Sequence, residues 1–137
     1  MKFSIINICI ICICVFYVNA GCKKDPYYPD FEHAGGYVIE KEHCKIDTAQ
    51  DYWLIDLSYV DNPPNLNYGD TITIGSTFYS HMVKTNQLIP QFQLVGKKVS
   101  FDFHLSADKV NSTGCNVVNP VTYFLKSMEV IASGEIH

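Results

Sequence analysis

The chain contains no arginine, and its cations are ten lysines set against fourteen acidic residues. The formal net charge is therefore −4 at pH 7 with histidine neutral. Arginine is the side chain best suited to bidentate recognition of phosphate and of guanine, and a negative net charge repels a polyanion. We therefore expect no nucleic-acid partner.

Motifs for metal, cofactor and phosphate chemistry are missing as well. Beyond residue 21 the sequence has no CxxC pair, no HExxH pair, no glycine-rich phosphate loop and no dinucleotide-binding fingerprint. His43, His81 and His104 are scattered along the chain, whereas metal ligands occur at characteristic spacings. We expect neither a metal nor a cofactor.

A long hydrophobic run stands at the N-terminus. Lys2 precedes an apolar segment from Ile5 to Val18 that is broken by Asn7. Its length of about 14 residues falls short of the roughly 20 that a membrane-spanning helix needs, and small residues follow it directly. These features predict a secretory signal peptide over residues 1–21 rather than a spanning helix.

Residues 18–22 read VNAGC and resemble the lipobox of bacterial lipoproteins, which prefers leucine at the place of Asn19. The resemblance implies that Cys22 becomes the mature N-terminus and carries acyl chains, of which two or three anchor a protein firmly in a membrane. In many Gram-negative bacteria an aspartate directly after this cysteine retains lipoproteins in the inner membrane. Lys23 stands there instead, which implies the outer membrane, with its periplasmic or surface face left open. Ordinary signal cleavage that leaves Cys22 as a thiol is the alternative.

Two cysteines remain after this processing. Three of the six cysteines leave with the signal peptide and Cys22 is acylated, so Cys44 and Cys115 are left in an exported chain. Because disulfides form in oxidising compartments, we expect these two residues to be paired. The alternative is a thiol site in which His43 activates Cys44.

The mature chain divides into a tether and one domain. Residues 22–35 carry two prolines and run up to the Gly35-Gly36 pair, and we interpret them as the lipidated cysteine followed by a spacer. Residues 36–137 show a period of two in their apolar residues without a sustained helical repeat, which predicts a mainly β domain. The expected strands are residues 37–41, 52–60, 71–83 with a break at Gly75-Ser76, 99–105, and 121–132 with a bulge at Lys126-Ser127.

The number and spacing of these strands favour a particular β fold. Five strands, with one short turn at residues 88–92 before the fourth, suit a small five-stranded Greek-key barrel of the OB type. A β-sandwich or an up-and-down barrel is the alternative. Residues 88–92 (LIPQF) and 96–101 (GKKVSF) resemble a stretch of small uncharacterised Bacteroidetes lipoproteins with an OB-like domain, which have no established activity. In such a barrel the loops that carry Cys44 and Cys115 flank the usual ligand face.

Polar residues on the predicted strands offer two catalytic patterns. Ser100, Asp102 and His104 share one strand face, but same-face neighbours lie roughly 6.6 to 7 Å apart, too far for a nucleophile and its base. Glu40 and Glu42 are a possible carboxylate pair for glycoside hydrolysis, but they are neighbours on one strand edge. The two carboxylates of a glycoside hydrolase normally lie on opposite sides of the bond that is cleaved. A solvated strand face explains both patterns better, so we predict no enzyme and no catalytic residue.

Aromatic side chains are the remaining feature that indicates recognition. Most are expected in the core, which leaves Tyr68, Tyr79 and Tyr123 near predicted loops as possible ligand-face residues. We therefore expect an envelope lipoprotein that is a non-enzymatic binding module for a protein or glycan partner. One alternative is an inhibitor of a secreted hydrolase such as lysozyme, because an acidic domain is attracted to a cationic enzyme. A second, weakly supported alternative is a hydrolase built on the carboxylate pair or on Asp102 and His104.

Overall fold

The computed structural model describes residues 30–63 and 68–136, which form six β-strands and two short 3-10 turns. Within these ranges no helix has the length and apolar character that crossing a membrane requires. The lipidation site predicted at Cys22 lies outside the described residues. The elements are β1 Glu32–Lys41, η1 Thr48–Gln50, β2 Trp53–Asp56, β3 Asp70–Ile74, β4 Thr77–Thr85, η2 Pro90–Phe92, β5 Lys98–Val110 and β6 Leu125–Glu135.

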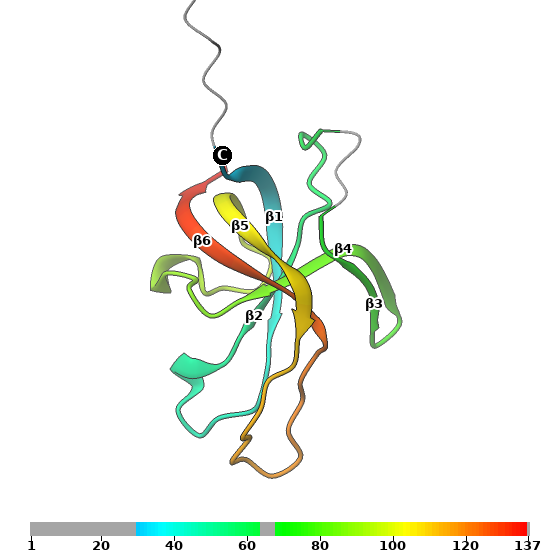
Figure 1. Ribbon diagram of the computed structural model, residues 1–137, viewed down its shortest axis with the longest axis vertical. Coiled ribbons are helices and arrows are strands. Elements are labelled where there is room, and N and C mark those ends of the chain that lie inside the picture. Colours follow the sequence, from blue (N-terminus) through cyan, green and yellow to red (C-terminus); the bar gives the residue numbers. More distant parts are fainter. Residues whose placement is uncertain (1–29, 64–67, 137) are drawn as a thin grey trace, which may run out of the picture.

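Five of the strands close into a ring of hydrogen-bonded neighbours, in the order β1, β2, β4, β6, β5 and back to β1 (Figure 1). β4 and β6 run parallel, whereas the other neighbours in the ring are antiparallel. An up-and-down barrel pairs successive antiparallel strands, so this ring is a Greek-key barrel of the OB type. The fold class predicted from the strand count is confirmed.

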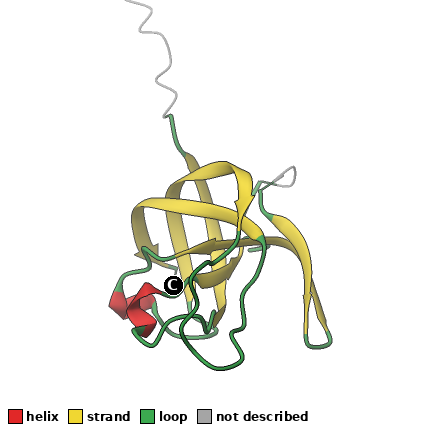
Figure 2. Ribbon diagram, turned by 60° about the horizontal axis from the view of Figure 1, so that its bottom comes forward, coloured by secondary structure: helices red, strands yellow, loops and turns green. Residues whose placement is uncertain are grey.

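β3 is a sixth strand that the sequence pattern merged with β4. The break expected at Gly75-Ser76 is a hairpin turn, in which Gly75 adopts a φ of +59° and β3 folds back onto β4. Glycine suits this position because a side chain is strained at positive φ. Figure 2 shows the β3–β4 hairpin extending away from the barrel wall.

β1 starts earlier than the predicted domain. It begins at Glu32, so that residues 32–35, which the sequence assigned to the tether, pair with β5. The Gly35-Gly36 pair lies within the strand. A Cβ atom on Gly36 would lie 2.7 Å from Ile55 Cγ2, so glycine permits the close approach of β1 and β2.

Two other strands are shorter than predicted. β2 ends at Asp56 rather than at residue 60, because the Asp56 carboxylate accepts hydrogen bonds of 3.2 and 2.6 Å from the Ser58 N–H and hydroxyl and turns the chain. β6 starts at Leu125 rather than at residue 121. The bulge predicted at Lys126-Ser127 is found on the neighbouring strand instead, since residues 106–108 of β5 are the extra residues opposite Ser127.

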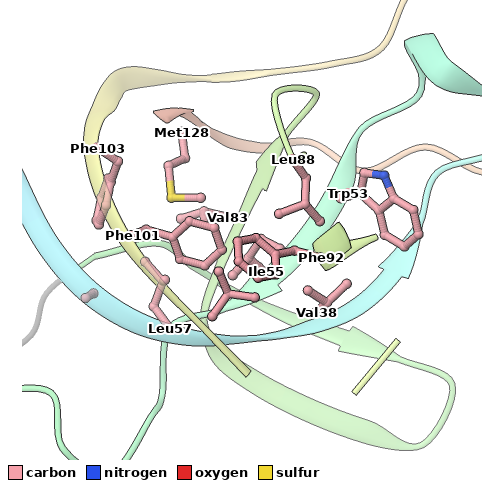
Figure 3. Packing of buried hydrophobic residues seen from close by; sticks show 12 residues of the cluster. Val38, Trp53, Ile55, Leu57, Val83, Leu88, Phe92, Phe101, Phe103 and Met128 are labelled. Atoms are coloured by element: carbon pink, nitrogen blue, oxygen red, sulfur yellow. The ribbon is translucent and has the colours of Figure 1, made fainter. Parts of the chain in front are cut away.

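The hydrophobic core fills the inside of the ring (Figure 3). The alternation predicted for β5 is confirmed, because Val99, Phe101 and Phe103 are fully buried. The η2 turn adds Phe92 to the same cluster, so the expected single turn before β5 contributes to the core. The barrel interior is thus occupied by apolar side chains, and binding chemistry has to be sought on the loops and the outer faces.

Candidate functional site

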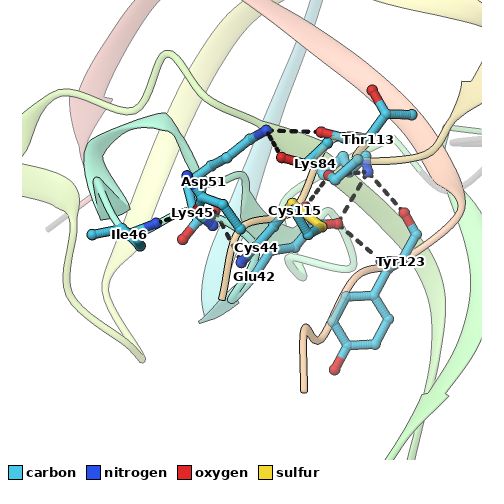
Figure 4. The surroundings of a disulfide bond; sticks show 12 residues. Glu42, Cys44, Lys45, Ile46, Asp51, Lys84, Thr113, Cys115 and Tyr123 are labelled. Carbon is cyan, nitrogen blue, oxygen red and sulfur yellow. Dashed lines mark hydrogen bonds and ion pairs between the residues drawn. A yellow bond between two sulfur atoms is a disulfide. The ribbon is translucent and has the colours of Figure 1, made fainter. Parts of the chain in front are cut away.

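Two loops of the barrel are joined covalently. The first loop, residues 42–52, connects β1 to β2, and the second, residues 111–124, connects β5 to β6. Cys44 of the first loop and Cys115 of the second form a disulfide, with their Cα atoms 4.5 Å apart (Figure 4). The pairing predicted from the sequence is confirmed. We refer to these two loops as the loop pair.

Hydrogen bonds reinforce the disulfide along the loop pair. The backbones of His43 and Val121 exchange two hydrogen bonds of 2.9 and 2.8 Å, as in an antiparallel ladder. The Asn116 N–H donates to the Cys44 carbonyl at 2.9 Å, and the Asn116 side-chain oxygen accepts from the Ile46 N–H at 2.8 Å. The disulfide and these hydrogen bonds therefore hold the two loops in one arrangement.

A buried ion pair connects strand β4 of the barrel to both loops of the loop pair. The Lys84 ammonium donates to Glu42 Oε1 at 3.0 Å, and both side chains are completely buried. Glu42 also accepts from the Ser112 hydroxyl and, at 2.9 Å, from the Tyr123 N–H. Lys84 donates in addition to the Tyr123 carbonyl at 2.8 Å, and its Nζ lies 4.6 Å from the centre of the Tyr52 ring. Both buried charges have several partners, as desolvated ions require.

Reasoning from the sequence missed Lys84. A lysine in a strand is usually a surface residue, and nothing in the local pattern around residue 84 signals burial. The sequence also paired Glu40 with Glu42 as a candidate acid and base. The structure gives them separate roles, since Glu42 binds Lys84 and Glu40 accepts a hydrogen bond from the Tyr123 hydroxyl.

The three tyrosines predicted as ligand-face residues are not gathered at one place. Tyr123 donates its hydroxyl to Glu40, and burial together with the hydrogen bond to Glu40 and its charge raises the Tyr123 pKa to about 12. Tyr79 is half-buried in the same small apolar cluster as Tyr123. Tyr68 instead packs edge-to-face on Phe103, with ring centroids 5.5 Å apart. All three rings therefore contribute to packing within the protein.

Large apolar side chains on the loop pair face the solvent. The exposed fractions are 75% for Ile46, 85% for Val118, 48% for Val121 and 63% for Phe124. We refer to these four residues as the loop patch. Exposed apolar residues also occur elsewhere on the barrel, but these four share two loops that a disulfide joins, which makes the loop pair the candidate interaction surface.

The face of β5 that carries Ser100 and Asp102 also has a histidine from the neighbouring strand β1, which the predicted Ser100, Asp102 and His104 pattern did not include. His33 of β1 stands opposite Asp102, and its Nδ1 lies 2.5 Å from Asp102 Oδ1. The Ser100 hydroxyl donates to the Gly134 carbonyl at 3.2 Å. Among the described residues no hydrogen bond joins Ser100 to a histidine, so this face lacks the contact by which a histidine activates a serine nucleophile.

Within residues 30–63 and 68–136, no group of three or more histidine, cysteine, aspartate or glutamate side chains is placed to hold a metal ion. Comparison with known proteins gave no match, whether by protein-family models, by curated protein sequences or by solved structures. The geometry of the loop pair is therefore the basis for a functional assignment.

Proposed function

We propose that this protein is a non-enzymatic binding module of the cell envelope that presents the loop pair to a protein partner. The observation that carries the proposal is the exposure of the loop patch on loops held by a disulfide and by backbone hydrogen bonds. Apolar side chains gain free energy when a partner removes them from water. Loops that are already ordered lose little conformational freedom on binding, which favours affinity.

A protein partner fits this surface better than a glycan does. A glycan site built on the predicted aromatics would need exposed rings, but Tyr79 and Tyr123 are half-buried in one apolar cluster and the Tyr123 hydroxyl is bound to Glu40. Three of the four exposed side chains of the loop patch are aliphatic, and Phe124 adds an aromatic ring. Such a surface resembles the apolar centre of a protein–protein interface, where a few large side chains contribute most of the affinity.

Attachment to the outer membrane is part of the same proposal. The apolar leader over residues 1–21 and the lipobox-like residues 18–22 support export and acylation of Cys22, as in the Bacteroidetes lipoproteins that the chain resembles. Residues 23–31 separate Cys22 from the start of β1. A chain of that length reaches about 30 Å when fully extended, which allows the barrel to meet a partner close to the membrane surface.

Two matched variants of the full chain test the proposed surface. Phe124 in the loop patch is 63% exposed and Phe78 on the β3–β4 hairpin is 66% exposed, so serine at either place removes a similar apolar area. Each variant is expressed in the native host and cross-linked in its membranes, and captured proteins are identified by mass spectrometry. Burial of a phenylalanine contributes about 1.5–3 kcal/mol, so Phe124→Ser should weaken capture about ten- to a hundredfold. Phe78→Ser should capture the partner like the wild type, and equal capture by both variants would contradict the proposal.

An inhibitor of a cationic secreted hydrolase is a second candidate. It is favoured by the excess of fourteen acidic residues over ten lysines, because opposite net charges accelerate association. Lysozyme mixed with the full chain should lose activity at low salt and regain it as salt screens the attraction. Full lysozyme activity at low salt would eliminate this candidate and leave the binding module in place.

A further inference from the structure

The β3–β4 hairpin leaves a strand edge open. β3, residues Asp70–Ile74, pairs with β4 and with no other strand among residues 30–63 and 68–136. Figure 1 shows β3 as the outermost strand beside β4, and Figure 2 shows the hairpin extending from the barrel wall. An edge strand presents backbone N–H and C=O groups that can pair with a further strand.

The turn of the hairpin determines which backbone groups point to the open edge. Only two residues separate Ile74 from Thr77, so these two form the hydrogen-bonded pair that closes the hairpin. Pairs alternate along an antiparallel ladder, and in the next pair, Thr73 with Phe78, the N–H and C=O groups point away from the neighbouring strand. The backbone groups of Thr73 therefore face the open edge, and by the same alternation so do those of Thr71. Both threonines are exposed.

The open edge lacks most of the features that prevent strand addition, such as a lysine, a proline or a charge along the strand. Residues 71–74 read TITI, which is uncharged and entirely β-branched, a composition that favours strands. The charge of β3 is at its buried end, where the Asp70 carboxylate pairs with Lys109 at 2.9 Å and accepts from the Lys126 N–H at 2.7 Å. The register shift between Asp70 and Ile72 lies at the same end. The rest of the strand is open to pairing.

Two other open stretches are less suited to strand addition. Residues 104–110 of β5 extend beyond the end of its pairing with β1, but they carry the charges of Asp108 and Lys109. On the other side of the hairpin, the Leu57 N–H donates to the His81 carbonyl at 3.0 Å, so the segment after β2 already contacts β4 there. β3 therefore offers a better edge than either stretch.

We propose that the β3 edge pairs with the β3 edge of a second copy of this chain, in antiparallel orientation about a two-fold axis. In the register that places Ile72 opposite Ile72 of the second copy, Thr71 of each copy faces Thr73 of the other. The backbone groups that point to the open edge then pair with one another, and threonine meets threonine on the exposed face. No like charges meet, because Asp70 stands opposite Ile74.

The symmetry of this pairing favours a second copy over a different protein. Each copy has one β3, so pairing about a two-fold axis uses both edges and closes without growth into a fibre. A strand of another protein would need uncharged β-branched residues in the same register, and this chain supplies such a strand itself. A strand of five residues makes a small interface, so the population of the dimer depends on concentration. The inference is independent of the partner proposed for the loop pair, which is formed by other segments.

Amide hydrogen exchange of the full chain in detergent, followed by NMR over a range of protein concentrations, tests the pairing. Detergent is kept in excess so that micelles outnumber protein molecules. The amides of Thr71 and Thr73 should exchange rapidly in dilute protein and become protected as the concentration rises, whereas the Ile72 amide, which faces β4, should be protected at every concentration. Thr73→Pro should weaken dimerisation about tenfold or more, because it removes a donor at the open edge from both copies.

Two further variants at the same position separate strand addition from a general loss of the fold. Thr73→Val keeps the N–H group and the β-branched shape, so it should dimerise like the wild type. Thr73→Lys keeps the N–H group but places a charge on the edge, and it should weaken dimerisation. If Thr73→Pro does not fold, the comparison of the valine and lysine variants decides.

Several results would overturn the proposal. They are protection of the Thr71 and Thr73 amides that does not change with concentration, dimerisation of Thr73→Pro like that of the wild type, and self-association that Phe124→Ser abolishes. Cross-linking from Thr73→Cys in native membranes that yields a different protein and no second copy would assign the edge to that protein instead.

Discussion

Replacement of Lys84 by methionine is expected to be one of the most damaging single substitutions in this barrel. Methionine keeps a long apolar stem but removes the ammonium, which leaves the fully buried Glu42 carboxylate without a cation. The hydrogen bonds from Lys84 to the Ser112 hydroxyl and the Tyr123 carbonyl are lost as well. Removing one partner of a buried ion pair costs about 3–5 kcal/mol. A small domain has a free energy of unfolding of about 5–15 kcal/mol, so much of the stability depends on this residue.

The double variant Glu42→Gln with Lys84→Met separates the buried charge from the shape of the side chains. Glutamine carries no charge, its oxygen can accept from the Tyr123 N–H, and its amide NH2 can donate to the Ser112 hydroxyl. We therefore expect the double variant to be about 2 kcal/mol more stable than Lys84→Met alone. The gain would show that the main cost of the single substitution is an isolated buried carboxylate.

Urea unfolding at neutral pH, with the disulfide intact, measures these differences. Lys97→Met is the control, because the ammonium of Lys97 pairs with Glu135 at the surface and its loss should cost less than about 1 kcal/mol. A loss of stability for Lys84→Met no larger than for Lys97→Met would refute the reasoning. So would a double variant that is less stable than Lys84→Met.

Three further outcomes are expected. Replacing both Cys44 and Cys115 by serine should lower the free energy of unfolding by up to about 4 kcal/mol, since the bond closes a loop with a sequence separation of 71 residues; an unchanged urea midpoint would contradict this. The Tyr123 pKa of about 12 lies above its ordinary value of 10.0, so the stability that it contributes is complete below pH 10 and is lost as the pH rises toward 12. Tyr123→Phe should therefore flatten the fall of unfolding free energy over that range, and a slope equal to that of the wild type would count against the assignment. Cys22→Ser should release the protein from membranes, because acyl chains contribute about 0.8 kcal/mol per buried methylene; sedimentation of the variant with membranes would contradict lipidation.

The β class and the disulfide could be predicted because their causes are visible in the sequence itself. Strict alternation over residues 99–105 places Val99, Phe101 and Phe103 on one face of a strand, and that face is buried. Cys44 and Cys115 are the pair that remains once the leader and the lipobox-like cysteine are set aside. Neither prediction depends on knowing which distant segments meet.

Strand boundaries were less predictable because contacts from other strands decide them. The Gly35-Gly36 pair has the composition of a break, yet in the barrel it allows β1 to approach β2 closely. The end of β2 depends on the Asp56 side chain, which turns the chain at Ser58. In each case the same residues are compatible with two local structures, and the fold selects one.

The candidate site was predicted in outline and not in detail. An OB-type barrel implies that the two cysteine-bearing loops lie together, as they do. The burial of Lys84 arises from Glu42, which is 42 residues away in the sequence, and from the second loop. Burial of a charge by remote segments leaves no periodic signal in the sequence.

The position of the last strand in the ring governs when the barrel can be completed. β6 lies between β4 and β5, and it comes from the C-terminal residues 125–135. Without those residues both neighbouring strands keep an open edge, and the ring of strands does not close. Folds dominated by such distant pairings take about milliseconds to seconds to form. Loss of β6 would therefore leave two unpaired strand edges, which are sites at which other chains can add by β-pairing.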